Sequence, residues 1–124
     1  MGMSRILLVE DDCILNQDLA LYLKSLNYDV RSMYSGSTAF DAIDRHEHFL
    51  ALITDIDLGN GPSGVDVARY ARAFYPHLPV LFISGRAGER DVNHGVIGSE
   101  FIPKPFQAGQ IAAALVRLIR LEAA

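Results

Sequence analysis

Three short stretches of the chain are apolar at every position, and they give the first outline of the fold. They cover residues 6–9, 50–53 and 80–83. A short run without polar interruption is typical of a strand that is buried on both faces, as in a parallel sheet. Residues 30–33 and 100–102 are two weaker candidates for strands.

The segments between these runs carry apolar residues at the spacing of a helix. Such a stripe places apolar side chains on one face of the helix. Residues 37–43 predict a shorter helix, and residues 86–99, which contain three glycines, predict the poorest one. The three clearest stripes are Leu15, Leu19, Tyr22 and Leu26; Val67, Ala71 and Phe74; and Ile111, Leu115 and Leu118.

Strands and helices therefore alternate along the chain, which predicts an α/β fold. Five βα units with right-handed crossovers give a five-stranded parallel sheet with helices on both faces, a doubly wound (βα)5 arrangement. We expect residues 1–124 to form a single domain, with no output domain visible. In such sheets a ligand site lies beyond the carboxyl ends of the strands, where the strand order reverses.

Composition narrows the possible partners. The formal net charge is -4, and the 11 Lys and Arg residues are scattered, whereas nucleic-acid binding needs clustered basic side chains. Cys13 is the single cysteine, which excludes an internal disulfide and favours a reducing compartment. The sequence has neither a signal-peptide pattern nor an apolar run of membrane-spanning length. We therefore expect a cytoplasmic protein with a protein partner and neither nucleic acid nor membrane.

Polar residues follow four of the predicted strands, so they should meet at one edge of the sheet. Several carboxylates packed together repel one another, and a bound cation relieves that repulsion. A set of oxygen ligands too small to fill a coordination shell suits Mg²⁺, which keeps several waters and binds phosphoryl oxygens. These residues are Glu10, Asp11 and Asp12 after the first strand, Asp55 after the third, Ser84 after the fourth and Lys104 after the fifth.

The same residues suggest phosphoryl chemistry. A carboxylate beside a cation can attack phosphorus and form an acyl phosphate. A lysine and a hydroxyl would then stabilise the charge on the phosphoryl oxygens, and Asp55, Lys104 and Ser84 match these needs. Simpler structural roles exist for single residues: Asp55 could cap a loop, Asp57 could be a turn residue, and Asp12 is expected to begin the first helix.

Four segments resemble the motifs of bacterial two-component response-regulator receiver (CheY-like) domains. They are ILLVEDD, LITDIDLG, PVLFISG and FIPKPF, in the family's order. The resemblance implies a flavodoxin-like sheet in the order 2-1-3-4-5. It also implies that Asp55 accepts a phosphoryl group from a histidine kinase or a histidine phosphotransfer protein. Glu10, Asp11, Asp55 and the backbone carbonyl of Asp57 would hold Mg²⁺, for which Mn²⁺ would substitute.

The resemblance also implies a switching mechanism. Ser84 and Phe101 would occupy the family's hydroxyl and aromatic switch positions, and Lys104 would pair with the acyl phosphate. The Lys104-Pro105 bond would be cis, an isomer open to X-Pro bonds at modest cost. The protein would be a signalling switch that catalyses its own phosphorylation and dephosphorylation, not an ordinary enzyme. Its downstream target or a second copy would bind the family's face of helix 4, strand 5 and helix 5.

The chain departs from the family pattern, and two other functions stay open. Gly59 stands where the family usually has proline, and the segment between Ser84 and Lys104 is short and rich in glycine, which affects the expected fourth helix. Asp55-Ile56-Asp57 also resembles the DxD motif of haloacid dehalogenase-like, metal-dependent phosphatases, in which the second Asp is a general acid. A receiver-like scaffold that is never phosphorylated is the other alternative.

Overall fold

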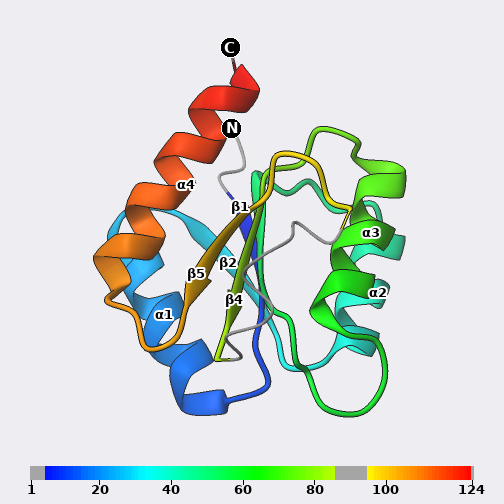
Figure 1. Cartoon of the computed structure of the whole chain (residues 1–124), viewed down its shortest axis with the longest axis horizontal. Helices are drawn as coiled ribbons and strands as arrows, with labels where there is room; N and C mark the ends of the chain where they lie inside the picture. The colour runs from blue at the N-terminus through cyan, green and yellow to red at the C-terminus, as the bar shows by residue number, and fades with distance from the viewer. Residues whose placement is uncertain (1–4, 86–94, 124) are drawn as a thin grey trace.

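A parallel sheet of five strands forms the centre of the molecule (Figure 1). The computed structural model describes residues 5–85 and 95–123. The strand order is β2-β1-β3-β4-β5, and every neighbouring pair is parallel. The predicted fold and strand order are confirmed. The strands are β1 (Arg5–Val9), β2 (Asp29–Met33), β3 (Ala51–Asp55), β4 (Val80–Ser84) and β5 (Glu100–Pro103).

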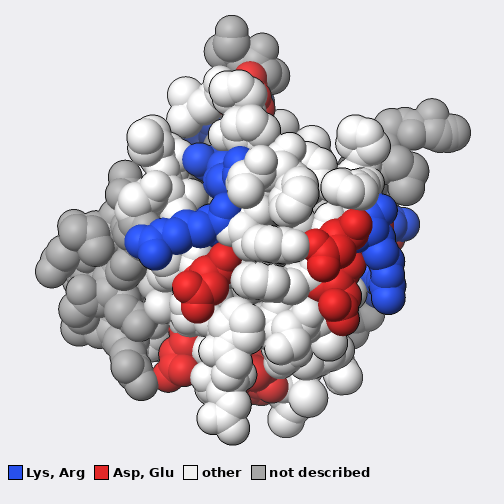
Figure 2. Space-filling model, turned by 90° about the vertical axis from the view of Figure 1, so that its right-hand side faces the viewer, with Lys and Arg blue, Asp and Glu red and all other residues white. Residues whose placement is uncertain are grey.

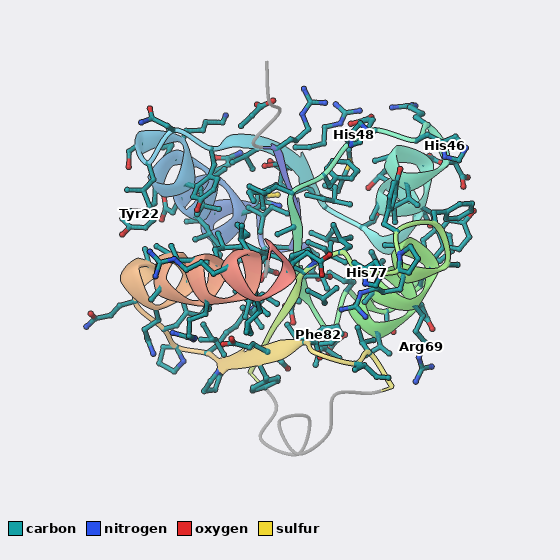
Figure 3. All side chains as sticks on the ribbon, turned by 90° about the horizontal axis from the view of Figure 1, so that it is seen from above. Tyr22, His46, His48, Arg69, His77 and Phe82 are labelled. Atoms are coloured by element: carbon teal, nitrogen blue, oxygen red, sulfur yellow. The ribbon has the colours of Figure 1, made fainter. Side chains whose placement is uncertain are left out.

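Four helices in residues 5–85 and 95–123 cover the two faces of this sheet. Figures 1 and 3 show α1 and α4 on one side of the strands and α2 and α3 on the other. The apolar stripes predicted α1, α3 and α4, which follow β1, β3 and β5, and the shorter helix expected over residues 37–43 is α2, which follows β2. They are α1 (Cys13–Ser25), α2 (Gly36–Asp44), α3 (Gly64–Phe74) and α4 (Ala108–Ala123). None of the helices in the described part of the chain is long and apolar enough to cross a membrane.

The helix expected over residues 86–99 falls largely outside the described residues, which leave out 86–94. The described part of that segment, residues 95–99, forms turns before β5 begins at Glu100. Gly95 and Gly98 both adopt positive φ angles there, of 77° and 79°. A left-handed backbone is accessible to glycine at no steric cost, so these two glycines fit turns better than a helix.

The side chains of the central strands alternate between two hydrophobic layers. In β1, Leu7 and Val9 face the layer under α2 and α3, and Ile6 and Leu8 face the layer under α1 and α4. All residues of β3 and β4 are buried. Phe82, labelled in Figure 3, belongs to the layer under α2 and α3. Burial on both faces explains why these strands read as unbroken apolar runs.

The amino edge of the sheet, where β1 and β2 begin, is closed by ion pairs. Arg5 lies 2.9 Å from Asp29 and 3.3 Å from Glu47, and Arg31 lies 3.3 Å from Glu47. Tyr75 also donates a hydrogen bond of 3.0 Å to the carbonyl of Glu47. These contacts join residues that are far apart in the sequence and hold the loop before β3 against β1 and β2.

The outer surface of α2 and α3 contains an aromatic cluster. The rings of Phe40 and Tyr70 stack with centroids 4.2 Å apart, and Tyr70 packs edge-on against Phe74 at 5.2 Å. Figure 2 shows the α2 and α3 side of the molecule, where charged groups of both signs surround a central uncharged band. The cluster joins the two helices across their exposed side.

Candidate functional site

The first acidic group follows β1 directly. The Glu10 side chain is 1% exposed. Its Oε2 accepts a hydrogen bond of 3.0 Å from the backbone N–H of Asp12, and its own backbone N–H donates to Met33 at 3.1 Å. Asp12 Oδ1 accepts hydrogen bonds from Ile14 N and Leu15 N, so it caps α1 as expected. Asp11 lies between them and is exposed.

The second acidic group is Asp55, the last residue of β3, which is 5% exposed. The backbone N–H of Asp57 donates to Asp55 Oδ1 at 3.3 Å. Asp57 Oδ1 in turn accepts from the Gly59 N–H at 3.1 Å, so its side chain stabilises the turn after the strand. Gly64 packs directly on this strand end, because a Cβ atom there would lie 1.8 Å from the carbonyl oxygen of Asp55.

Lys104 connects the two acidic strand ends. Its ammonium group donates to Asp55 Oδ2 at 2.8 Å and lies 2.7 Å from Glu10 Oε1. Its backbone N–H donates to the carbonyl of Ser84 at 2.9 Å, which ties the end of β5 to the end of β4. The Lys104-Pro105 peptide bond is cis, the isomer that the family resemblance implied. The lysine is thereby fixed over the carboxyl edge of the sheet.

The electrostatics of this edge are unbalanced. Burial raises the pKa of Glu10 to about 7, although the Lys104 ammonium and the Asp12 N–H act against the rise. Burial alone would lower the pKa of Lys104, but its contacts with Asp55 and Glu10 outweigh burial and raise it. Among the described residues Glu10 Oε1 accepts no hydrogen bond, so its contact with Lys104 is an ion pair without hydrogen-bond geometry.

These residues fit a divalent cation. Glu10, Asp11 and Asp55 each offer a carboxylate oxygen, and the three oxygens lie within 4.8 Å of one another. Hard cations such as Mg²⁺ prefer oxygen ligands of this kind. The buried Glu10 Oε1 needs a further partner, and Lys104 alone cannot balance three carboxylates. The arrangement can therefore bind a cation next to an anionic group that Lys104 contacts.

Ser84 and Phe101, the two expected switch residues, lie on neighbouring strands. Ser84 is the last residue of β4 and is 1% exposed. Phe101 is half-buried on β5, opposite Phe82 in register, and packs on the layer under α2 and α3. Ser84 is therefore at the carboxyl edge itself, whereas Phe101 lies two positions before that edge in register and packs on the core.

Two buried polar residues at this edge were not predicted. Thr54 donates its hydroxyl hydrogen to the carbonyl of Asp55 at 2.9 Å. Asn16 donates to the carbonyls of Glu10 and Met33, both at 3.0 Å. Asn16 had a signal in the sequence: it begins the buried i, i+3, i+4, i+7 stripe of α1, where an apolar residue is expected. Thr54 had none, because threonine is an ordinary strand residue.

A doubly wound parallel sheet with an acidic group and a lysine at its carboxyl edge defines a flavodoxin-like α/β protein with a candidate cation site. The chain belongs to the response regulator receiver domain family, whose model matches residues 6–116. A receiver domain is a signalling switch and part of a two-component system. This assignment agrees with the motifs quoted above and accounts for four carboxyl strand ends carrying polar residues.

The chain is similar to several known receivers. The cell cycle response regulator CtrA of Brucella ovis is 30% identical over 118 residues, which cover 94% of this chain and 50% of CtrA. A response regulator receiver protein from Sinorhizobium medicae is 31% identical, with a TM-score of 0.90 over 95% of each chain. The receiver domain of the hybrid histidine kinase CckA is 27% identical, with a TM-score of 0.79 over 93% of this chain and 98% of that domain. This chain thus spans half the length of CtrA.

Proposed function

We propose that Asp55 accepts a phosphoryl group from the phosphohistidine of a histidine kinase or a histidine phosphotransfer protein. The observation that carries the proposal is the position of Lys104, 2.8 Å from Asp55 Oδ2 and 2.7 Å from Glu10 Oε1. A buried carboxylate held by an ammonium group and surrounded by further carboxylates suits transfer of a charged group. The similarity to CtrA and to the receiver of CckA supports the same chemistry.

The transfer step needs one bond to form and one to break. A carboxylate oxygen of Asp55 attacks phosphorus as the P–N bond of phosphohistidine breaks, and the departing imidazole nitrogen takes a proton from solvent. Lys104 would neutralise charge on the phosphoryl oxygens, and the Ser84 hydroxyl would donate a hydrogen bond to one of them. The signal ends when water attacks phosphorus, inorganic phosphate is released and the Asp55 carboxylate is the leaving group. The chain would thus catalyse its own phosphorylation and dephosphorylation.

Glu10, Asp11, Asp55 and the backbone carbonyl of Asp57 would hold Mg²⁺, or Mn²⁺ in its place. When bound there, the cation would supply positive charge beside the phosphoryl oxygens. Without it, three carboxylates would repel an incoming phosphoryl group, and the one ammonium of Lys104 would have to offset all of them.

Phosphorylation would act as a switch on a protein surface. A phosphoryl group adds negative charge and strong acceptor oxygens at the ends of β3 and β4. Ser84 would move toward them, Phe101 would repack on β5, and the surface of β5 and α4 would change for a downstream protein or a second copy. The exposed free thiol of Cys13 is compatible with a reducing compartment such as the cytoplasm.

Of the two alternative functions, the phosphatase requires Asp57 to act as a general acid. A general acid must reach the leaving group with its carboxyl, whereas Asp57 Oδ1 accepts the Gly59 N–H at 3.1 Å as part of a turn. This contact favours a receiver over a phosphatase. The unphosphorylated scaffold has no such observation in its favour, because the acidic group and Lys104 are together at one edge.

The test compares three proteins: the wild type, Asp55→Asn and the neighbouring control Asp57→Asn. Each is incubated with Mg²⁺ and acetyl phosphate, and the intact mass and the loss of phosphodonor are measured. We expect one hydroxylamine-sensitive phosphoryl adduct on the wild type and on Asp57→Asn, no adduct on Asp55→Asn, and none on any protein when EDTA replaces Mg²⁺. These substitutions keep the side-chain size and remove one charge.

The other outcomes separate the alternatives. An adduct on Asp55→Asn would overturn the acceptor assignment. Fast turnover of phosphate esters that is lost in Asp57→Asn would favour the phosphatase. If the wild type forms no adduct and consumes neither acetyl phosphate nor the phosphoryl group of a phosphorylated phosphotransfer protein, the scaffold replaces the proposed function.

A further inference from the structure

Asn16 is a fully buried polar residue on the face of α1 that packs against the sheet. It shares this face with Leu19, Ala20 and Leu23, all buried in the layer under α1 and α4. Burying an amide in such a layer is unfavourable unless its polar atoms form hydrogen bonds. The contacts of its side chain therefore identify what the residue does.

The side-chain amide of Asn16 bridges two backbone carbonyls at the ends of neighbouring strands. Nδ2 donates to the carbonyl of Glu10 at 3.0 Å and to that of Met33 at 3.0 Å. The last paired residues of β1 and β2 are Val9 and Met33, so Glu10 lies one residue beyond the ladder. The Glu10 N–H also donates to the Met33 carbonyl, at 3.1 Å. Asn16 thus continues the connection between the two strands past their last pair.

The Glu10 carbonyl belongs to the peptide group that joins Glu10 to Asp11. The orientation of this peptide sets the direction in which the Asp11 side chain leaves the backbone. The Glu10 carboxylate has its own supports, the Asp12 N–H at 3.0 Å and the Lys104 ammonium at 2.7 Å. Asp11 is exposed, so its direction depends much more on the backbone that carries it.

The remaining polar atom of the side chain argues against a role in packing alone. Asn16 Oδ1 is buried and accepts no hydrogen bond from the part of the chain that the structure describes. An apolar side chain would avoid that unsatisfied acceptor but would leave the Glu10 carbonyl without the amide. The unsatisfied Oδ1 of Asn16 therefore lowers stability, whereas its Nδ2 supports the Glu10-Asp11 peptide.

We propose that Asn16 is a positioning residue that fixes the Glu10-Asp11 peptide and so keeps the Asp11 carboxylate close enough to those of Glu10 and Asp55 to share a divalent cation. This inference rests on the proposed function and deepens it, since it assigns the preorganisation of the site to a residue that touches neither the cation nor the phosphoryl group. Removing a group that hydrogen-bonds to a metal ligand and orients it commonly weakens metal affinity by about 10-fold to 100-fold.

The test measures Mn²⁺ affinity by electron paramagnetic resonance of the free ion, with no phosphodonor present. Asn16→Leu removes both donated hydrogen bonds at similar size, and Asn16→Asp keeps the shape but replaces the donor with an acceptor. Leu19→Ala is the matched control, because it weakens the same buried face of α1 and leaves the amide in place. We expect both Asn16 variants to bind Mn²⁺ about 10-fold more weakly and Leu19→Ala to bind within about 2-fold of the wild type.

The outcomes that overturn the inference differ from those that overturn the proposed function. Wild-type affinity in Asn16→Leu, or an equal loss in Leu19→Ala, would leave Asn16 a structural residue only, whereas a wild type that binds Mn²⁺ and is phosphorylated keeps the proposed function. If the Asn16 variants do not fold, the side-chain amide resonance of Asn16 is followed in the wild type during Mg²⁺ titration. A shift that saturates with binding supports the inference, and an unchanged resonance overturns it.

Discussion

The two edges of the sheet carry clusters of charged residues that differ in balance. At the amino edge two arginines face two carboxylates, with Arg5 and Arg31 both within 3.3 Å of Glu47. At the carboxyl edge three carboxylates share one ammonium group, and Glu10 and Asp55 are almost completely buried. The first cluster is neutral in itself, whereas the second has excess negative charge.

This difference in charge balance distinguishes a structural cluster from the candidate functional site. Paired charges at a surface add little to stability and need nothing further. Buried like charges cost stability, and the raised pKa of Glu10 reflects burial and neighbouring carboxylates that Lys104 does not fully offset. A bound cation would bring positive charge to the carboxyl edge, so the repulsion that costs stability in the free protein would favour binding of the cation. The amino edge has no comparable excess of negative charge that could favour the binding of a cation.

The largest expected effect comes from a single methyl group at the carboxyl edge. In Gly64→Ala the new Cβ would lie 1.8 Å from the Asp55 carbonyl oxygen and 2.7 Å from its carbonyl carbon, so the backbone of the strand end must move. We expect a loss of stability of about 3 kcal/mol or more, together with loss of phosphorylation. Urea unfolding and the intact mass after acetyl phosphate measure the two effects.

The matching control is Gly98→Ala near the amino edge. Gly98, unlike Gly64, has a positive φ, 79°, and a Cβ there meets no atom within 4 Å. Only the left-handed backbone is then strained, which costs about 1 kcal/mol. Equal losses in the two variants would show that the contact with Asp55 does not constrain the strand end.

The second prediction concerns pH, because the carboxyl edge should lose stability as pH rises. Glu10 has a pKa of about 7 in the folded chain against an ordinary 4.5, so between these values the folded state binds more protons than the unfolded state. The free energy of unfolding of the metal-free protein should therefore fall as pH increases from about 4.5 to about 7, by at most about 3 kcal/mol. Added Mg²⁺ should reduce this fall, since it favours the ionised carboxylate.

Other carboxylates titrate in part of the same range, so the measurement is a difference. Urea unfolding of the wild type and of Glu10→Gln is compared in EDTA at several pH values between 4.5 and 8. The glutamine cannot titrate, and the excess slope of the wild type belongs to Glu10. Parallel curves for the two proteins would contradict the raised pKa.

The sequence was sufficient to predict the fold and the acidic residues and lysine at the carboxyl edge of the sheet, but not the buried Asn16 and Thr54 there. The apolar run 50–53 predicted a buried strand, and β3 covers Ala51–Asp55, with the acidic residue at its end. Burial on both faces leaves an unmistakable pattern, and parallel strands bring their carboxyl ends to one edge. The gathering of Glu10, Asp11 and Asp55 followed from topology alone.

Contacts that depend on long-range geometry could not be read in this way. The pairing of Arg5 with Asp29 and Glu47 joins residues 24 and 42 positions apart, and nothing local in the sequence selects these partners. The close contact of Gly64 with the Asp55 carbonyl has no local signal in the sequence either, because it depends on how the loop returns to the sheet. The helix expected over residues 86–99 had three glycines against it, and its described end, residues 95–99, forms turns.

The smallest effects test the comparison of the two edges most directly. Removing one negative charge should change the free energy of unfolding in opposite directions at the two edges. At pH 8, in EDTA, Asp11→Asn relieves repulsion within the acidic group and should raise the free energy of unfolding by about 0.5 kcal/mol. Glu47→Gln removes a carboxylate that pairs with both Arg5 and Arg31, although Arg5 keeps Asp29, and should lower the free energy of unfolding by about 0.5 kcal/mol.

The two variants should also differ in how much Mg²⁺ stabilises them. Ligand binding to the folded state stabilises it, so Mg²⁺ should raise the melting temperature of the wild type and of Glu47→Gln. It should do little for Asp11→Asn, which has lost one of three carboxylates. Thermal unfolding with and without Mg²⁺ measures both effects. If Asp11→Asn is less stable than the wild type in EDTA, the negative charges at the carboxyl edge are already balanced in the free chain, and the contrast between the two edges does not hold.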